Sequence, residues 1–254
     1  MPLIYSLARI TLLEAVRNRL LWLATLIVGV GLGLAGFLSQ VALIESVEIE
    51  TTILAALLRT ASVFVIATFV ITSMVRESND RVNELILSQA APRAAYFLGR
   101  LSGFLLVAMA LALLFALPLT LFVPAKNVAF WMGSLICELS IVVSVSLFCV
   151  QSLTQLLPAF STTISFYALA RSMAAMQVIA SFSPGSTPWV DKVITQIVNF
   201  IALILPSLDQ MTQTSWLLSG APALSVIGRI LFQILLYDTL IGSAALFDLY
   251  RKSY

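Results

Sequence analysis

Long runs of apolar residues without a charge are the most constraining feature of this 254-residue sequence. The first run, Leu20–Leu38, would be about 28 Å long as an α-helix and would cross the hydrocarbon core of a bilayer. Of all residues, 60% are hydrophobic and only 10% are charged, whereas soluble domains carry about 25% charged residues. The sequence therefore predicts an all-α polytopic membrane protein and excludes an ordinary soluble domain.

Five further runs have the length and composition of a membrane-spanning helix. They are Ile53–Val75, Leu101–Val123, Val128–Val150, Leu156–Phe182 and Ala223–Phe247. A shorter run, Val193–Leu208, contains Gln196 and Asn199 and is predicted to form a re-entrant or interfacial helix. We therefore expect one domain, residues 1–254, with six transmembrane helices and a short helix in the outer-face segment 183–222.

The distribution of Lys and Arg predicts the orientation, because basic residues collect in cytoplasmic segments near the ends of membrane spans. If the N-terminus is cytoplasmic, only Lys126 and Lys192 fall on the outer side of the membrane. The basic residues that fall on the cytoplasmic side are Arg9, Arg17, Arg19, Arg76, Arg81, Arg93, Arg100, Arg251 and Lys252. This bias predicts cytoplasmic N- and C-termini and requires an even number of crossings.

The residue content excludes several kinds of site. The sequence has no histidine, which removes imidazole metal ligands and histidine-based catalytic dyads. A formal charge of +2 gives no indication of a nucleic acid partner. The sequence also has no G-x-x-x-x-G-K-[ST] phosphate loop and no intramembrane protease motif. We expect no enzyme activity, metal or cofactor in this chain itself.

Residues 1–19 precede the first span and have a helical apolar pattern. Leu7, Ile10 and Leu13 recur at steps of three, with polar residues between them, which predicts a helix lying in the membrane interface. The charged positions that we assign to this helix are Arg9, Glu14, Arg17 and Arg19. The pattern is compatible with a plain membrane anchor and with an elbow helix that packs beside a partner subunit.

Residues 76–100 are expected to form the largest cytoplasmic loop. Ser78 or Asn79 is predicted to cap a short helix, and Pro92 is predicted to begin the helix that leads into the third span. The face of the short helix would consist of Val82, Leu85, Ile86 and Gln89. A solvated connector and a docking element for a cytoplasmic protein both fit this pattern.

Three charged residues, Glu138, Arg171 and Asp238, lie deep within predicted spans, where an unpaired charge costs about 2.5–3.5 kcal/mol. We expect Glu138 to pair with Arg171, with Asp238 sharing or competing for the arginine. The pair would be either an internal salt bridge that fixes helix packing or part of a substrate or proton pathway. Arg59 and Arg229 are predicted to lie near the outer ends of their spans and to extend to the interface.

Several stretches of the sequence resemble one family. In the loop they are Glu77, Glu84, LILS at Leu85–Ser88, Arg93 and LGR at Leu98–Arg100; elsewhere they are TLLEAVRNRLLWL at Thr11–Leu23, LPSLDQ at Leu205–Gln210 and DLYRKSY at Asp248–Tyr254. These stretches are similar to the type-2 permeases of ATP-binding-cassette transporters, especially the small six-span bacterial permease of the nitrous-oxide-reductase maturation system. Ala90 and Pro92 stand where that family usually has Pro and Ser.

The resemblance implies a homodimer in the bacterial inner membrane that sits on two ATP-binding subunits, which would hold the ATP and Mg. It implies that residues 76–100 contain a coupling helix. Its coupling residues would be Glu77, Glu84, Leu85, Arg93 and Arg100. The complex would export a hydrophobic or amphipathic substrate, with membrane lipids and an extracytoplasmic accessory protein as further partners. Alternatively, it would be an ATPase-driven module that moves an extracytoplasmic partner protein without transporting cargo.

Overall fold

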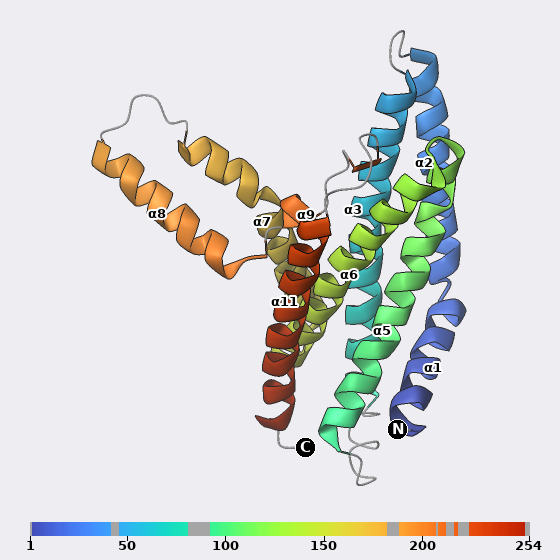
Figure 1. Ribbon diagram of the computed structural model, residues 1–254. Coiled ribbons are helices and arrows are strands. Elements are labelled where there is room, and N and C mark those ends of the chain that lie inside the picture. The colour runs from blue at the N-terminus through green and yellow to red at the C-terminus, as the bar shows by residue number, and fades with distance from the viewer. Residues whose placement is uncertain are drawn as a thin grey trace.

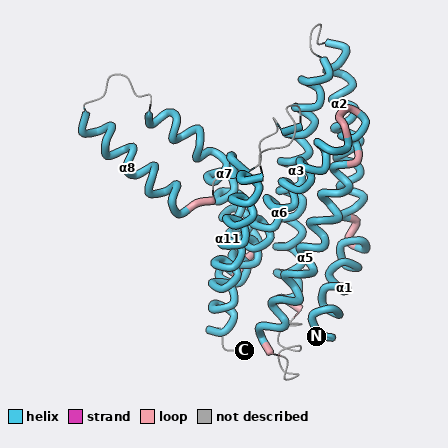
Figure 2. The backbone as a smooth tube through the Cα atoms, viewed as in Figure 1, coloured by secondary structure: helices cyan, strands magenta, loops and turns pink. Residues whose placement is uncertain are grey.

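The computed structural model describes residues 2–41, 46–80, 92–181, 188–206, 208–211, 216–217 and 224–251, and every regular element in these ranges is a helix (Figures 1 and 2). The longer helices are α1 (Pro2–Arg17), α2 (Leu20–Val41), α3 (Ser46–Asn79), α5 (Arg93–Ala116), α6 (Ala125–Leu153), α7 (Leu156–Ser181), α8 (Pro188–Ile204) and α11 (Leu224–Arg251). Two short helices are η1 (Pro118–Leu121) and α9 (Leu208–Met211).

Five helices are long and apolar enough to span a membrane. Their spanning stretches are Leu20–Phe37, Glu50–Asn79, Arg93–Leu121, Ala125–Leu153 and Val226–Arg251. Each overlaps a predicted span and confirms it as an apolar helix of spanning length. The remaining predicted span, Leu156–Phe182, forms α7 but is not among the five, because several Ser and Thr residues and Arg171 interrupt its apolar sequence. The count of six crossings therefore stays a prediction.

Helix α6 forms the centre of the bundle. It packs against α3, α5, α7 and α11, and 78% of its spanning stretch is buried, compared with 22% for both α2 and α11. From Glu138 to Leu147 every side chain of α6 is buried. A helix that is buried on all sides belongs to a core, so α2 and α11 are the peripheral helices of this bundle.

Helix α1 lies along α5, and two glycines of α5 permit the close approach. A Cβ atom at Gly99 would lie 2.9 Å from Leu7 Cδ1, and one at Gly103 would lie 2.7 Å from Thr11 Cβ. Glycines four residues apart are a common feature of closely packed membrane helices. The bulky side chains of Ile10, Leu13 and Val16 remain exposed on α1, as expected for a helix that also contacts a membrane interface.

Both chain ends lie at the same end of the bundle (Figure 1). Arg93, the first residue of α5, donates Nη1 hydrogen bonds to the carbonyl oxygens of Leu249 and Tyr250, both at 3.1 Å, near the end of α11. We call this end the basic end, because several arginines gather there. They are Arg17, Arg76, Arg93 and Arg251 at helix ends, and Arg100 two turns into α5.

Helix α3 continues through Ser78 to Asn79. The short helix that is predicted to follow these residues, with Val82, Leu85, Ile86 and Gln89 on its face, lies outside the described residues and stays a prediction. The last turn of α3 stays helical because contacts with α1 and α5 hold Arg76 and Glu77 in place. The predicted helix into the third span exists as α5, but it begins at Arg93, and Pro92 is its N-cap residue in an extended conformation.

The first part of α7 packs against α3 and α6, whereas its later part and α8 form an antiparallel pair that leans away from the other helices (Figure 1). The short helix predicted at Val193–Leu208 exists as α8, but it begins earlier, at Pro188, because proline fits the first turn of a helix. With 17 residues, α8 is shorter than a typical membrane span. Its re-entrant or interfacial position stays a prediction.

The contact between α1 and α5 predicts a specific effect of adding one methyl group. We expect Gly103→Ala to lower stability by about 1–3 kcal/mol, because the new Cβ would overlap Thr11 and lie 3.1 Å from Ala8 Cα. Gly228→Ala is the matched control, since a Cβ there meets nothing within 4 Å. Thermal unfolding of the detergent-purified protein measures both variants. Equal melting temperatures for the two would contradict the close packing of α1 on α5.

Candidate functional site

Five polar side chains from three helices meet inside the bundle, and we call them the central cluster. They are Arg59 of α3, Ser134 and Glu138 of α6, and Tyr167 and Arg171 of α7. Arg59 donates from Nη1 to Glu138 Oε2 at 2.9 Å and from Nη2 to Ser134 Oγ at 3.0 Å. The Tyr167 hydroxyl donates to Glu138 Oε1 at 2.9 Å, and Arg171 Nη1 lies 3.7 Å from the same oxygen.

The ion pair at the heart of the central cluster is fully enclosed. The side chains of Arg59 and Glu138 are 1% and 0% exposed, whereas that of Arg171 is 32% exposed. The ring of Trp131 lies 5.2 Å from Arg59 Cζ and covers the guanidinium. Two guanidinium groups thus share the carboxylate of Glu138. Arg59 binds one of its oxygens, and Tyr167 and Arg171 contact the other. The arrangement joins α3, α6 and α7 at one depth.

The position of Arg59 differs from the prediction that it extends to the outer interface. Helix α3 begins at Ser46, well before the apolar run, so Arg59 lies about 20 Å from the helix start at 1.5 Å per residue. At that depth it pairs with Glu138. The predicted contact between Glu138 and Arg171 is present, but it is the longer of the two ion pairs.

The predicted participation of Asp238 in this cluster is not found among the interactions of the described residues. Asp238 of α11 accepts a hydrogen bond from Ser144 Oγ at 2.9 Å. Ser144 lies six residues beyond Glu138 on α6, on the side of the helix that packs against α11. Asp238 therefore joins α11 to α6, and Glu138 joins α3 and α7 to α6.

Sequence reasoning missed Ser134 and Tyr167. Each lies four residues before a charged residue that the sequence did identify, Glu138 on α6 and Arg171 on α7. Residues four apart share one face of a helix, so this spacing was a usable signal. Hydroxyl side chains are common in membrane helices, however, so the spacing alone does not identify a site. Their role is evident only from the structure, in which Ser134 contacts Arg59 of α3 and Tyr167 contacts Glu138.

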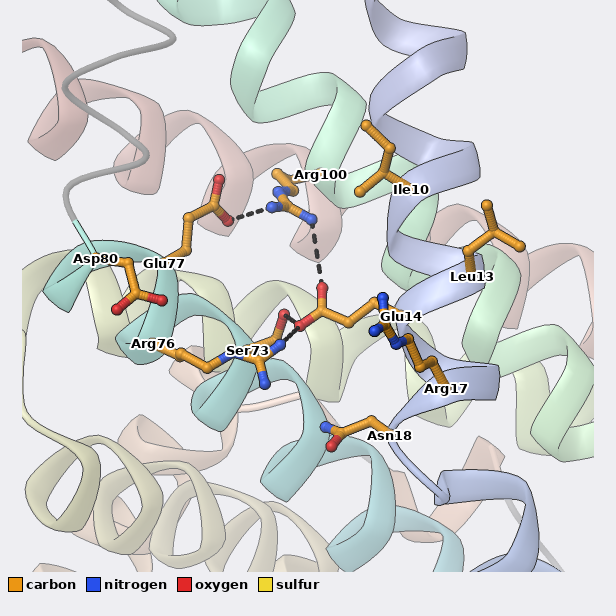
Figure 3. Close-up of a pocket in the computed structure, with 10 residues that line it drawn as sticks. All are labelled: Ile10, Leu13, Glu14, Arg17, Asn18, Ser73, Arg76, Glu77, Asp80 and Arg100. Carbon is orange, nitrogen blue, oxygen red and sulfur yellow. Dashed lines mark hydrogen bonds and ion pairs between the residues drawn. The ribbon is translucent and has the colours of Figure 1, made fainter.

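A second group of charged residues joins three helices at the basic end, and we call it the basic-end cluster (Figure 3). It consists of Glu14 of α1, Ser73, Arg76 and Glu77 of α3, and Arg100 of α5. Glu14 Oε1 accepts hydrogen bonds from Ser73 Oγ at 2.9 Å and from Arg76 Nη2 at 2.5 Å. Arg100 pairs with Glu77, donates to Thr11 Oγ1 at 2.8 Å and lies 3.8 Å from Glu14 Oε2.

The basic-end cluster lines one side of an open pocket of about 670 Å³ between α1 and α3 (Figure 3). Arg17, Asn18 and Asp80 complete the polar part of its lining. Charges of both signs line the pocket, and the two arginines of the cluster balance its two glutamates. The pocket is therefore a polar site at the point where α1 turns into α2.

The predicted coupling residues occupy two kinds of environment. Glu77 and Arg100 are buried in the basic-end cluster, with 5% and 7% of their side chains exposed, so they can influence a partner only through the position of their helices. Arg93 caps the end of α11, with its guanidinium 5.9 Å from the ring of Tyr250. Glu84 and Leu85 lie outside the described residues.

The predicted elbow residues also separate into two groups. Glu14 is half-buried and holds α1 to α3, whereas Arg9, Arg17 and Arg19 are exposed. Helix α1 ends at Arg17, and Arg19 adopts a φ of 57° in the turn before α2. This left-handed conformation costs about 1–2 kcal/mol for a residue with a side chain. The turn that separates α1 from the first span is therefore held by its surroundings.

No protein-family model and no curated protein matches this sequence. Within the part of the chain that the structure describes, no group of three or more Cys, Asp or Glu side chains is placed to hold a metal ion. The features that point to a function are therefore the two charged clusters and the apolar helices that carry them.

The enclosed ion pair predicts a large effect of removing one charge. We expect Glu138→Gln to lower stability by about 3–5 kcal/mol, because Arg59 would remain buried without a carboxylate. The double variant Arg59→Met with Glu138→Gln should recover part of this loss, because the uncompensated buried charge is removed. The melting temperature in detergent measures both effects.

The control for this prediction is Glu48→Gln, which neutralises an exposed carboxylate on the same α3 helix that carries Arg59. We expect no measurable change in its melting temperature, since exposed charges contribute little to stability. If Glu138→Gln and Glu48→Gln melted at the same temperature, the ion pair would not organise the bundle.

Proposed function

We propose that this chain is the membrane-spanning permease subunit of an ATP-driven transporter of the bacterial inner membrane. Two copies would form a homodimer and would sit on two separate ATP-binding subunits, which supply the ATP and Mg. The basic end would face the cytoplasm, in line with the preference of Lys and Arg for that side. The chain itself would have no enzymatic activity.

The observation that carries this proposal is the basic-end cluster. Helices α3 and α5 are the two that flank residues 80–92, where a partner ATPase would dock. The cluster ties both helices to α1 through Glu14, Glu77 and Arg100. A force applied between α3 and α5 would therefore move α1 as well, which is what a coupling element needs to do.

The proposed cargo is hydrophobic or amphipathic, and the structure supports this in one respect. The peripheral helices α2 and α11 expose large apolar side chains along their length. Examples are Trp22, Leu26, Phe37, Phe232 and Phe247. These surfaces suit contact with lipid and with a second copy of the chain. A strongly polar cargo would need a hydrated path, and the charged groups at the centre of the bundle are already paired with one another.

One observation favours the alternative, in which the complex moves an extracytoplasmic partner protein. Helix α8 exposes a row of large apolar side chains on one face, and the α7–α8 pair leans away from the bundle (Figure 1). The row consists of Trp189, Val193, Ile197, Phe200 and Ile201. This face would suit a partner protein outside the membrane as well as the membrane surface itself.

Co-purification from the native host tests the proposal directly. A tagged version of the full chain is extracted in detergent, and the proteins that remain bound are identified by mass spectrometry. We expect an ATP-binding subunit at a one-to-one ratio. An additional envelope protein would favour the alternative mode of action, and recovery of the chain without any ATP-binding protein would contradict both.

A charge reversal in the expected docking segment should uncouple the partner. We expect Glu84→Arg to abolish the stimulation of the partner's ATPase activity while leaving the melting temperature of the chain unchanged. Lys126→Glu is the matched control, because it reverses an exposed charge at the opposite end of the bundle, at the start of α6. ATPase assays on the reconstituted complex measure both, and equal stimulation in the two variants would contradict docking at this segment.

A further inference from the structure

The polar pocket at the basic end adjoins an apolar groove between α2 and α3. The groove has a volume of about 700 Å³, and its lining includes Leu23 and Leu26 of α2 and Phe64 and Phe69 of α3. Asn18, in the turn between α1 and α2, lines both the pocket and the groove. The two cavities are therefore neighbours on either side of Asn18, one polar at the basic end and one apolar beyond it.

The length of the groove matches one leaflet of a bilayer. Along α3 its lining extends from Thr72, next to the polar pocket, to Ala61, near the central cluster. Eleven helical steps of 1.5 Å give about 16 Å, and half of a hydrocarbon core is about 15 Å thick. The groove thus has the dimensions of a single acyl chain that begins at the basic end and stops near the middle of the bundle.

The polar end of the site carries an excess of positive charge. Four arginines and three carboxylates line the two cavities, and the pairs formed by Arg76 and Arg100 account for two of the carboxylates. Arg17 and Arg19 are exposed on either side of Asn18, and among the described residues neither forms an ion pair with a carboxylate. Guanidinium groups in this position suit the phosphate of a lipid headgroup.

We propose that this site binds one anionic phospholipid from the leaflet at the basic end. The phosphate lies between Arg17 and Arg19, the Asn18 amide and Ser73 hydroxyl line the headgroup pocket, and one acyl chain fills the groove between α2 and α3. A lipid held in this way packs α2 against α3 and supports the turn at Arg19. The site requires only that α2 and α3 cross a bilayer, so it is independent of the proposed ATPase partner.

The test uses the full chain, purified in detergent and titrated with phosphatidylglycerol or with phosphatidylcholine of the same acyl composition. Native mass spectrometry counts the bound lipids, and the melting temperature reports their effect. We expect phosphatidylglycerol to bind more tightly and to raise the melting temperature. The double variant Arg17→Gln with Arg19→Gln should weaken phosphatidylglycerol binding roughly tenfold or more. Phosphatidylcholine binding should weaken less, because the choline cation offsets the charge of the phosphate that the arginines contact.

Matched controls separate the headgroup pocket from the groove. Arg9→Gln with Arg251→Gln removes two exposed arginines that line neither cavity, and it should bind phosphatidylglycerol like the original chain. Thr68→Trp places a large ring in the groove and should weaken binding of both lipids. Thr60→Trp, at an exposed position of the same helix outside the groove, should not.

Two results would overturn the proposal. The first is that the chain binds both lipids equally tightly and that none of the variants changes this affinity. That result would mean that the lipids only coat the apolar surface. The second is a shift of the chain from dimer to monomer in Thr68→Trp without any change in lipid binding, which would show that a second copy of the chain fills the groove. The two proposals fail separately. A chain that co-purifies with an ATP-binding subunit but does not bind phosphatidylglycerol contradicts only the lipid site, and a chain that binds phosphatidylglycerol without such a subunit contradicts only the proposed function.

Discussion

The enclosed ion pair between Arg59 and Glu138 is the interaction on which the bundle depends. In an apolar interior, a guanidinium and a carboxylate are tolerated when they pair with each other and with further polar side chains. The pair joins α3 to the central helix α6, and Tyr167 brings α7 to the same carboxylate. The requirement to keep these groups paired fixes the register of three helices, which apolar packing alone would leave free to slide.

Helix α3 connects this central cluster to the basic-end cluster. It carries Arg59 at the centre and Ser73, Arg76 and Glu77 at the end, about 27 Å apart from Arg59 to Glu77 at 1.5 Å per residue. An unbroken helix of 34 residues transmits displacement along its axis. The arrangement therefore links the place where an ATPase would dock to the charged centre of the bundle, and it makes α1, α3 and α5 one mechanical unit.

The sequence predicted those features that depend on local composition. Long apolar runs identify helices wherever they occur, and the segments of α2, α3, α5, α6 and α11 follow directly from them. Pro92 marks the start of α5 as its N-cap residue, because proline cannot continue a preceding helix and leaves the next residue free to begin one. The ends of helices were less predictable: α3 continues through Ser78 because its last turn is held by α1 and α5, which are distant in the sequence.

The clusters themselves depend on which helices become neighbours, and periodicity within one helix does not contain that information. Glu138 and Arg171 were identified as buried charges, but the principal partner of Glu138 is Arg59, whose depth follows from where α3 begins. Likewise, Arg100 and Glu77 were expected at a docking surface, and they instead face each other inside the basic-end cluster. Their contribution to coupling would come from holding helices together.

The proposed function requires α1, α3 and α5 to move as one unit when a partner ATPase binds ATP, and distances between spin labels test this requirement most directly. Labels at Arg9→Cys on α1 and Leu98→Cys on α5 occupy exposed positions, with the native Cys137 and Cys149 replaced by alanine. In the proposed complex with an ATP-binding subunit, the distance between Arg9 and Leu98 labels within one copy should stay constant when ATP is added, while the distance between the Arg9 labels of the two proposed copies changes. A change within one copy, with no change between copies, would contradict the account.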